Sequence, residues 1–140
     1  MTDTFNLARF VEAQDNYYDT ALAEMHAGQK WSHWIWFIFP QLKGLGSSAN
    51  AEYYGLSGLE EARAYLAHPV LGPRLREAVS AMLPHSDAAA VLGRLDAMKF
   101  RSCLTLFARA APDEPLFAEA LQRFFAGEPD GRTLQMLGNG

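Results

Sequence analysis

The segment Trp31–Gln41 constrains the fold of this chain more than any other. It holds all three tryptophans of the sequence, two of its nine phenylalanines and one of its four histidines. A stretch of this length is too short to cross a bilayer. Its large apolar surface must therefore be buried, either in the protein core or around a ligand.

A short helix is predicted inside this segment. Residues such as Trp31, Trp34 and Ile38 recur at helical spacing, and Pro40 would end a helix because it lacks an amide proton. A buried strand is the alternative, since aromatic residues and isoleucine also suit strands. The residues that follow, 44–49, are expected to form a loop.

The rest of the sequence predicts an all-α fold of seven to nine short helices with no sheet of note. Asn6 is expected to cap the first helix, the Asp15–Asn16 pair to interrupt it, and Ser57 to form a capping box with Glu60. The helix over 96–110 is apolar on most of its faces and is expected to be central. The remaining helices are expected over residues 6–14, 18–28, 57–68, 69–83, 87–92, 114–125 and 130–138.

The composition is typical of one globular domain. Hydrophobic residues make up 49% of the 140 residues and charged residues 20%, so burial can offset the entropy of ordering. We expect a single all-α domain over residues 1–140.

Several classes of partner are not expected. The net charge of −4, with basic residues scattered along the chain, gives no basic face for nucleic acid. No apolar run approaches the length of about 18 residues that a membrane span needs, and the N-terminus lacks the pattern of a signal peptide. A cytoplasmic protein with no membrane partner is therefore expected. The single cysteine, Cys103, excludes an internal disulfide and is expected in the core.

No metal or cofactor is expected either. The four histidines lie far apart in the sequence, and neither an HExxH pattern nor paired cysteines are present. His68, which precedes Pro69, is interpreted as a structural cap for the helix that follows.

Two places carry polar groups where burial is expected. His33 and Gln41 lie in the aromatic segment, and buried polar groups need a partner from the protein or a ligand. Lys99 and Ser102 are three residues apart and would share one face of a largely buried helix. Each has a structural alternative: His33 as a satisfied core histidine, Gln41 as the end of a helix, and Lys99 paired with Asp96.

These residues predict a ligand pocket between the Trp31–Gln41 segment and the Lys99/Ser102 helix. Trp36 or Tyr54 would stack on a planar ring, and Lys99 would meet a phosphate or carboxylate. His33 is the one weak candidate for a catalytic acid or base.

Several segments of the sequence resemble a known family. They are Ser32–Gln41, Gly44–Ser47, Phe5–Val11, Asp19–Leu22, Glu61–Gly72 and Asp96–Phe107. Through them the chain resembles, over nearly its whole length, the bacterial family called domain of unknown function 1810. Cys103 is a departure, because a second serine is expected there in relatives. The resemblance implies a compact all-helical fold with no established activity. The label calpastatin, sometimes given to such proteins, does not fit so apolar a chain, because calpastatin-type inhibitors are disordered.

Three functions fit these residues. The first is a domain that binds a small polar or anionic, nucleotide-like ligand in the predicted pocket. The second is a helical module for protein–protein interaction, in which the aromatic residues are only core. The third, suggested by a loose similarity of arrangement to domains that act on ADP-ribose derivatives, is a hydrolase of such compounds. The sequence leaves catalysis and the oligomeric state open.

Overall fold

The computed structural model describes residues 3–138 of the chain. Within this range nine helices are present and strands are absent, apart from one isolated bridge between Leu42 and Leu56. The prediction of an all-α fold of seven to nine helices is therefore confirmed. The helices are α1 (Ala8–Ala27), α2 (Ile35–Ile38), α3 (Ala49–Tyr53), α4 (Leu59–Ala67), α5 (Leu71–Met82), α6 (Ala88–Leu92), α7 (Arg94–Ala110), α8 (Pro115–Phe125) and α9 (Gly131–Met136).

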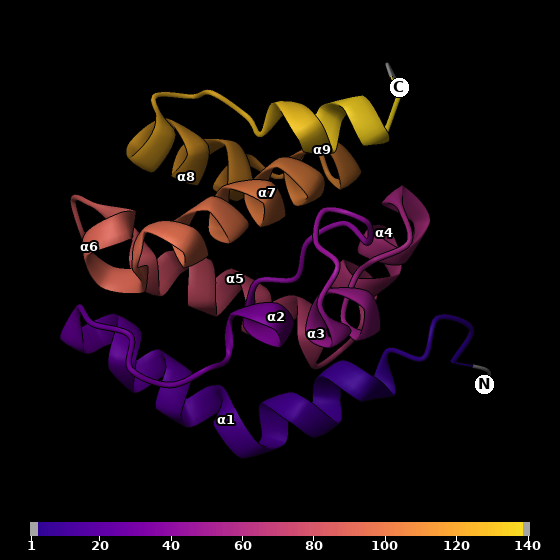
Figure 1. Ribbon diagram of the computed structural model, residues 1–140, viewed down its shortest axis with the longest axis horizontal. Helices are drawn as coiled ribbons and strands as arrows, with labels where there is room; N and C mark the ends of the chain where they lie inside the picture. The colour runs from indigo at the N-terminus through magenta and orange to yellow at the C-terminus, as the bar shows by residue number, and fades with distance from the viewer. Residues whose placement is uncertain (1–2, 139–140) are drawn as a thin grey trace.

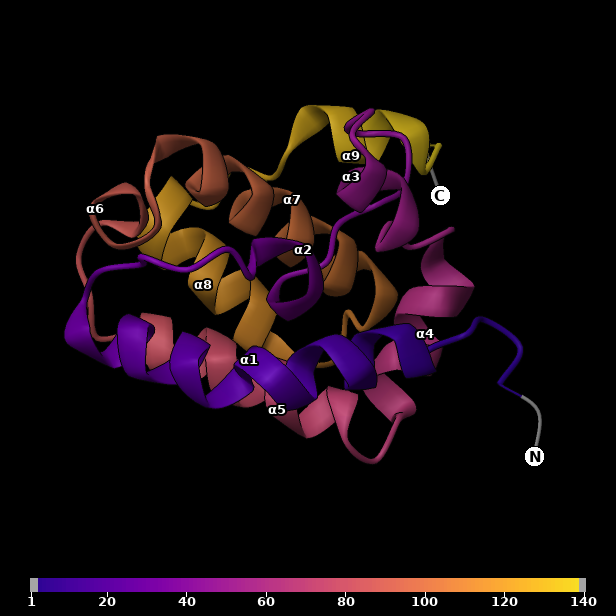
Figure 2. The same ribbon diagram turned by 60° about the horizontal axis from the view of Figure 1, so that its bottom comes forward.

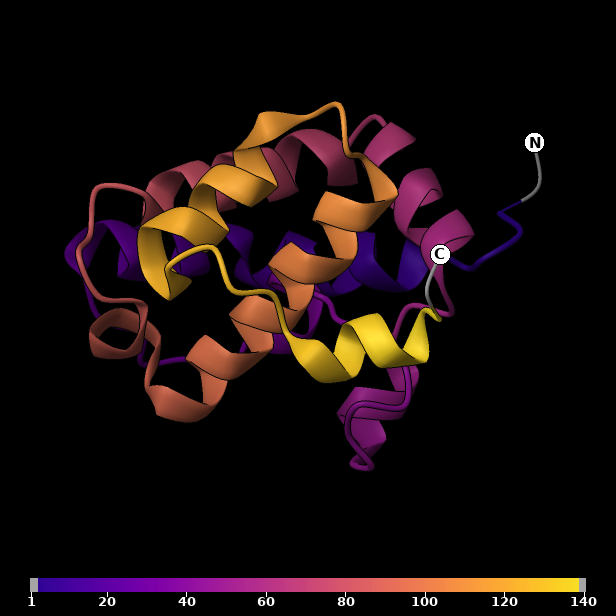
Figure 3. The ribbon, with the colours of Figure 1, turned by 90° about the horizontal axis from the view of Figure 1, so that it is seen from above.

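Helix α7 is the centre of the arrangement. It packs against α4, α6, α8 and α9 and touches α2, whereas α1 packs against α5 and α2 on the other side of the molecule (Figures 1 and 2). Seen from above, α9 lies alongside α7, beside the loop that leads to α3 (Figure 3). None of the helices within residues 3–138 combines the length and apolar character needed to cross a bilayer.

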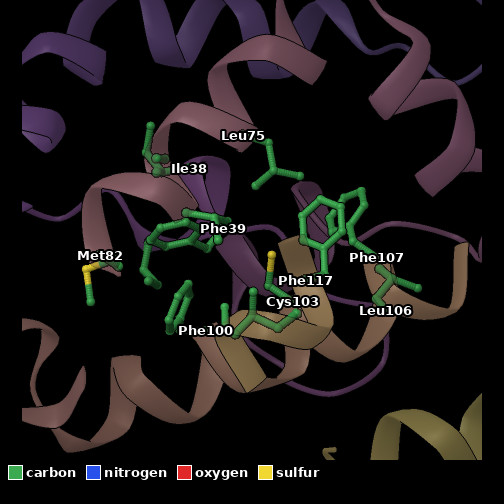
Figure 4. Packing of buried hydrophobic residues seen from close by; sticks show 14 of the residues in the cluster. Ile38, Phe39, Leu75, Met82, Phe100, Cys103, Leu106, Phe107 and Phe117 are labelled. Carbon is green, nitrogen blue, oxygen red and sulfur yellow. The ribbon is translucent and has the colours of Figure 1, made fainter. Parts of the chain in front are cut away.

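The core forms where α2, α5, α7 and α8 meet. Phe39 and Phe100 face each other with ring centroids 4.6 Å apart, and Cys103 lies one turn further along α7 (Figure 4). Phe100 and Cys103 are fully buried, as is Phe107 after them. The predictions that α7 is central and that Cys103 is a core residue are confirmed.

The first helix differs from the prediction. Helix α1 runs without interruption through Asp15 and Asn16, whose exposed side chains leave the buried face of the helix intact. Propensity is a weak signal, and packing of the apolar face overrides it here. Asn6 does not cap the helix, because the Asp3 carboxylate accepts the Leu7 and Ala8 amides at 2.7 and 2.9 Å instead.

Two other helix starts test the prediction. The expected capping box of Ser57 and Glu60 is wrong, because the N-cap of α4 is Gly58, without a side-chain cap, and the Ser57 hydroxyl and amide donate to Glu61. His68 caps α5 as expected, because its Nδ1 accepts from the backbone amides of Val70 and Leu71 at 3.1 and 3.2 Å.

The aromatic segment contains a helix and not a strand. Helix α2 spans Ile35–Ile38 and stops before Pro40, as predicted. The expected loop over 44–49 is correct for most of its length, but α3 then begins at Ala49, capped by the Ser48 hydroxyl, which accepts from the amide of Ala51 at 3.2 Å.

Candidate ligand pocket

Glu24 fixes the start of the aromatic segment. Its carboxylate accepts hydrogen bonds from the backbone amides of Trp31 and Ser32 at 2.9 and 3.0 Å. It also accepts the Ser32 hydroxyl at 2.6 Å and the Trp34 indole N–H at 2.9 Å. Burial alone would raise the pKa of Glu24, but the hydrogen bonds from Ser32, Trp34 and Trp31 outweigh it and lower the pKa to about 2. The carboxylate therefore stays ionised and holds the chain that enters α2.

Gln41 lies at the other end of the segment, and its backbone is fixed. Its carbonyl accepts the Leu56 amide at 3.0 Å, and the Lys43 amide donates to the Leu56 carbonyl at 2.8 Å. This close approach requires Gly55, because a Cβ there would lie 2.6 Å from the Cα of Lys43.

The side chain of Gln41 is largely buried and makes no hydrogen bond within residues 3–138. Only 8% of the residue is exposed. Residues 3–138 contain seven other buried polar side chains, and every one of these is hydrogen-bonded: Arg9, Gln14, Glu24, Glu61, Ser102, Thr105 and Thr133. The small accessible part of Gln41 opens into a pocket. Because no fully buried side-chain polar atom within residues 3–138 lacks a partner, the amide of Gln41 keeps contact with solvent through this pocket and is available to a ligand or to water.

Helix α7 supplies Lys99 and Ser102 to the same pocket. The Lys99 ammonium lies 4.9 Å from the centroid of the Trp36 ring and 3.1 Å from a carboxylate oxygen of Asp96. The other Asp96 oxygen pairs with Lys30 at 2.8 Å. Lys99 is therefore shielded, with a side chain 25% exposed, and shares its counter-ion with a second lysine.

Helix α9 supplies a second cation, Arg132. One guanidinium nitrogen of Arg132 donates to the Leu45 carbonyl at 3.1 Å. This is the one hydrogen bond that the Arg132 side chain makes within residues 3–138. Asp130 also lines the pocket, but one of its carboxylate oxygens caps α9 by accepting the amide and hydroxyl of Thr133. The sequence predicts a helix over 130–138 but does not place Arg132 at a pocket, because nothing local connects the last helix to the loop after Gln41.

The pocket has a volume of about 270 Å³. It lies between the end of the aromatic segment, the loop after it, α7 and α9. Its lining residues are Trp36, Gln41, Leu45, Gly46, Leu95, Met98, Lys99, Ser102, Asp130 and Arg132. Lys99 and Arg132 line the pocket with Asp130, and Lys99 is joined through Asp96 to Lys30. Three cationic side chains are thus grouped with two carboxylates. The pocket is therefore locally positive in a chain whose net charge is −4.

The structure brings together four of the six predicted site residues: Trp36, Gln41, Lys99 and Ser102. His33 is not among the lining residues, and the expectation that it is buried is wrong, because its side chain is exposed in the turn before α2. Tyr54 also lies elsewhere, packed against the rings of Phe10 and Phe37.

Larger hollows exist but contain no comparable group. One of about 610 Å³ lies beside Ser57 and Arg63, and one of about 730 Å³ lies between Val11 and His68. Ser57, Arg63 and His68 are all hydrogen-bonded to the protein. Size therefore does not select the candidate site, whereas the unpartnered amide of Gln41 does.

The lining residues favour binding over covalent chemistry. The Ser102 hydroxyl donates to the Met98 carbonyl at 3.2 Å, and no histidine lines the pocket to activate it. Burial raises the pKa of the Cys103 thiol well above its ordinary value, which keeps it protonated in the core. Within residues 3–138, no three His, Cys, Asp or Glu side chains are grouped so as to hold a metal ion.

Comparisons with known proteins agree with one another. A family model described as "Protein of unknown function (DUF1810)" matches residues 4–137. A crystal structure of the conserved hypothetical protein Rv1873 from Mycobacterium tuberculosis is similar, with 44% identity and a TM-score of 0.94. The match covers 96% of this chain and 98% of that one. No curated protein matches. The chain therefore belongs to the DUF1810 family, as the resemblance of its aromatic segment predicts.

Proposed function

We propose that this protein binds a small anionic ligand in the pocket between the end of the Trp31–Gln41 segment, α7 and α9. The observation that carries the proposal is the unpartnered amide of Gln41, a largely buried residue whose accessible part opens into this pocket. It lies in the same pocket as Lys99 and Arg132, which supply positive charge. Polar groups that converge in a mainly apolar cavity are characteristic of ligand sites.

The volume of the pocket limits the size of the ligand. Pockets for drug-sized molecules span about 300–1,000 Å³, and this one, at about 270 Å³, lies just below that range. A mononucleotide fragment or a small metabolite suits such a pocket better than a compound as long as ADP-ribose. Since His33 also lies outside the lining, no observation favours hydrolysis of ADP-ribose derivatives.

A thermal-shift screen of mononucleotides, small phosphorylated compounds and small carboxylic acids tests the proposal. A ligand at a hundred times its Kd stabilises the folded state by about 2.7 kcal/mol. We expect at least one compound to raise Tm by several degrees, and we expect Lys99→Ala to abolish that rise. The matched control is Lys43→Ala, which removes an exposed lysine that does not line this pocket.

Two results would contradict the proposal. One is a complete panel with no change in Tm, and the other is a ligand whose effect is as large in Lys99→Ala as in Lys43→Ala. The Lys99 side chain is only partly buried, and its ion pair with Asp96 is partly exposed to solvent. Its loss should therefore leave Tm of the free protein nearly unchanged.

A second function, protein–protein interaction, is favoured by the rim of the pocket. Leu95 and Met98, which line the pocket, are 68% and 61% exposed. Exposed apolar side chains that gather around a cavity are common at interaction sites. If this function is correct, Leu95→Ser and Met98→Ser will change the sedimentation behaviour of the protein or of its complex. The ligand screen will then show no change in Tm.

A further inference from the structure

We infer that the ligand is a small planar or cyclic acid that carries an amide-like edge, meaning a hydrogen-bond donor beside an acceptor. This inference rests on the proposed function and adds the chemical class of the ligand. It follows from three parts of the lining: Gln41, the pair of cations, and the apolar wall.

The amide of Gln41 defines the edge. A glutamine side chain offers one carbonyl acceptor and an NH2 donor in a fixed plane, and among the described residues 3–138 neither group has a partner. Only 8% of the residue is exposed, so the packing around it limits the freedom of the amide to turn away. A lone carboxylate or phosphate satisfies only the NH2 group. A lactam, imide or carboxamide satisfies both groups at once.

Lys99 and Arg132 define the acidic end. Lys99 shares Asp96 with Lys30, so its ammonium keeps donors free for an anion. Arg132 uses one nitrogen on the Leu45 carbonyl and has further N–H groups available. Asp130 opposes an anion, but one of its oxygens is held by Thr133 in the cap of α9. The excess of positive charge therefore favours one acidic group rather than several.

The apolar wall and the volume define the body. Leu45, Leu95 and Met98 line the rest of the pocket. Gly46 also lines the pocket beside the amide of Gln41. A cavity of about 270 Å³ with such walls suits a single ring. The face of Trp36 nearest Lys99 is covered by the ammonium, so the ring of the ligand rests on the aliphatic side chains.

Matched sets of compounds test the inference. In the first set, orotate has both the acid and the edge, benzoate has the acid alone and uracil has the edge alone. In the second set, pyroglutamate, cyclopentanecarboxylate and pyrrolidinone play the same three roles on a smaller ring. Affinities are measured by calorimetric titration with the full chain. We expect at least one compound with both groups to bind about tenfold more tightly than its two single-group counterparts, because each good hydrogen-bond pair contributes about that factor.

Variants assign each group to its partner. Gln41→Leu should reduce the affinity for the two-group compound to that of the acid alone and leave the acid unchanged. Lys99→Ala should weaken both acids equally. Gln135→Leu, at an exposed glutamine outside the pocket, is the control and should change nothing. Circular dichroism spectra and Tm of each variant show that it is folded before it is titrated.

The outcomes separate this inference from the proposed function. Equal affinity for the acids with and without the edge, or an equal loss of both in Gln41→Leu, overturns the inference and leaves anion binding standing. The same holds if none of these rings binds while a compound of the wider screen does. If no compound of either panel binds, both the inference and the proposed function fall.

Discussion

The ammonium of Lys99 lies 4.9 Å from the centroid of the Trp36 ring, which places a cation from α7 over an aromatic side chain of α2. Cation–π contact and the ion pair with Asp96 both hold this lysine at the mouth of the pocket. The cation is thus positioned before any ligand arrives, which lowers the entropic cost of binding. The same geometry makes Asp96 more important to the fold than Lys99.

We predict that Asp96→Asn destabilises the protein more than Lys99→Ala does. Asp96 neutralises both Lys99 and Lys30, and the Lys30 side chain is only 7% exposed. Loss of the carboxylate leaves a buried ammonium unpaired and should cost about 2 kcal/mol. Loss of Lys99 removes one partly exposed pair and should cost less than about 1 kcal/mol. Urea unfolding measures both values.

The exposed Asp113 gives the control for this comparison. Asp113→Asn should leave the free energy of unfolding unchanged, because no ion pair within residues 3–138 involves Asp113. If Lys99→Ala proves as destabilising as Asp96→Asn, the carboxylate does not serve two lysines in the way the distances indicate.

Glu24 predicts a dependence of stability on pH. Its pKa falls from an ordinary value of 4.5 to about 2 in the folded protein. The resulting stabilisation is fully present above pH 4.5 and is lost as the pH falls from 4.5 towards 2. Glu24→Gln should lower the free energy of unfolding near neutral pH by about 3 kcal/mol and flatten its decline over that acidic window.

Denaturant unfolding of the wild type and Glu24→Gln across the acidic range checks this prediction. Glu119→Gln, at an exposed carboxylate, is the control and should keep the acid sensitivity of the wild type. A Glu24→Gln variant that loses stability below pH 4.5 as steeply as the wild type would show that other carboxylates govern acid unfolding.

Local signals made most of the fold predictable. Pro40 ends α2, His68 caps α5, and Gly93 separates α6 from α7. Each of these boundaries depends only on residues that are close together in the sequence. The predicted break at Asp15–Asn16 failed because both residues lie on the exposed face of α1, where poor helix formers are tolerated. Only tertiary packing reveals which face that is.

Part of the candidate pocket was predictable from the sequence. Gln41 and Lys99 stand out in sequence because each is a polar residue in an apolar element, and the pocket contains both. The same reasoning failed for His33, since the aromatic segment is not uniformly buried and even Trp31 is 67% exposed. Arg132 reaches the pocket only through the docking of α9 beside Leu45, which no local pattern encodes.

Cys103 is predicted to be unreactive in the folded protein. It is fully buried in α7, and burial raises its pKa, so neither access nor thiolate is available. An aromatic disulfide reagent should modify no thiol in the native state and one thiol per chain in denaturant. Leu95→Cys, at a position 68% exposed, should add one thiol that reacts at once. Rapid modification of the native wild type would contradict the assignment of Cys103 to the core.

Arg9 and Glu61 form a buried ion pair, and their contributions to the free energy of unfolding should be strongly coupled. The two side chains, 8% and 4% exposed, meet at 2.9 Å, and Arg9 also donates to the carbonyls of Tyr53 and Gly55. Arg9→Met leaves the Glu61 carboxylate buried without its cation and should cost about 3–5 kcal/mol.

A double-mutant cycle tests the coupling. Once Glu61→Leu has removed the carboxylate, Arg9→Met should cost about 2 kcal/mol less than it does alone, because no buried charge is then left unpaired. The comparison pair is Arg101 and Glu128, which lie 3.5 Å apart on the surface with side chains 32% and 78% exposed. Its coupling should be about 0.5 kcal/mol or less. Equal coupling in the two cycles would mean that burial adds nothing to the Arg9–Glu61 pair, and that α1 and α4 are joined by apolar packing alone.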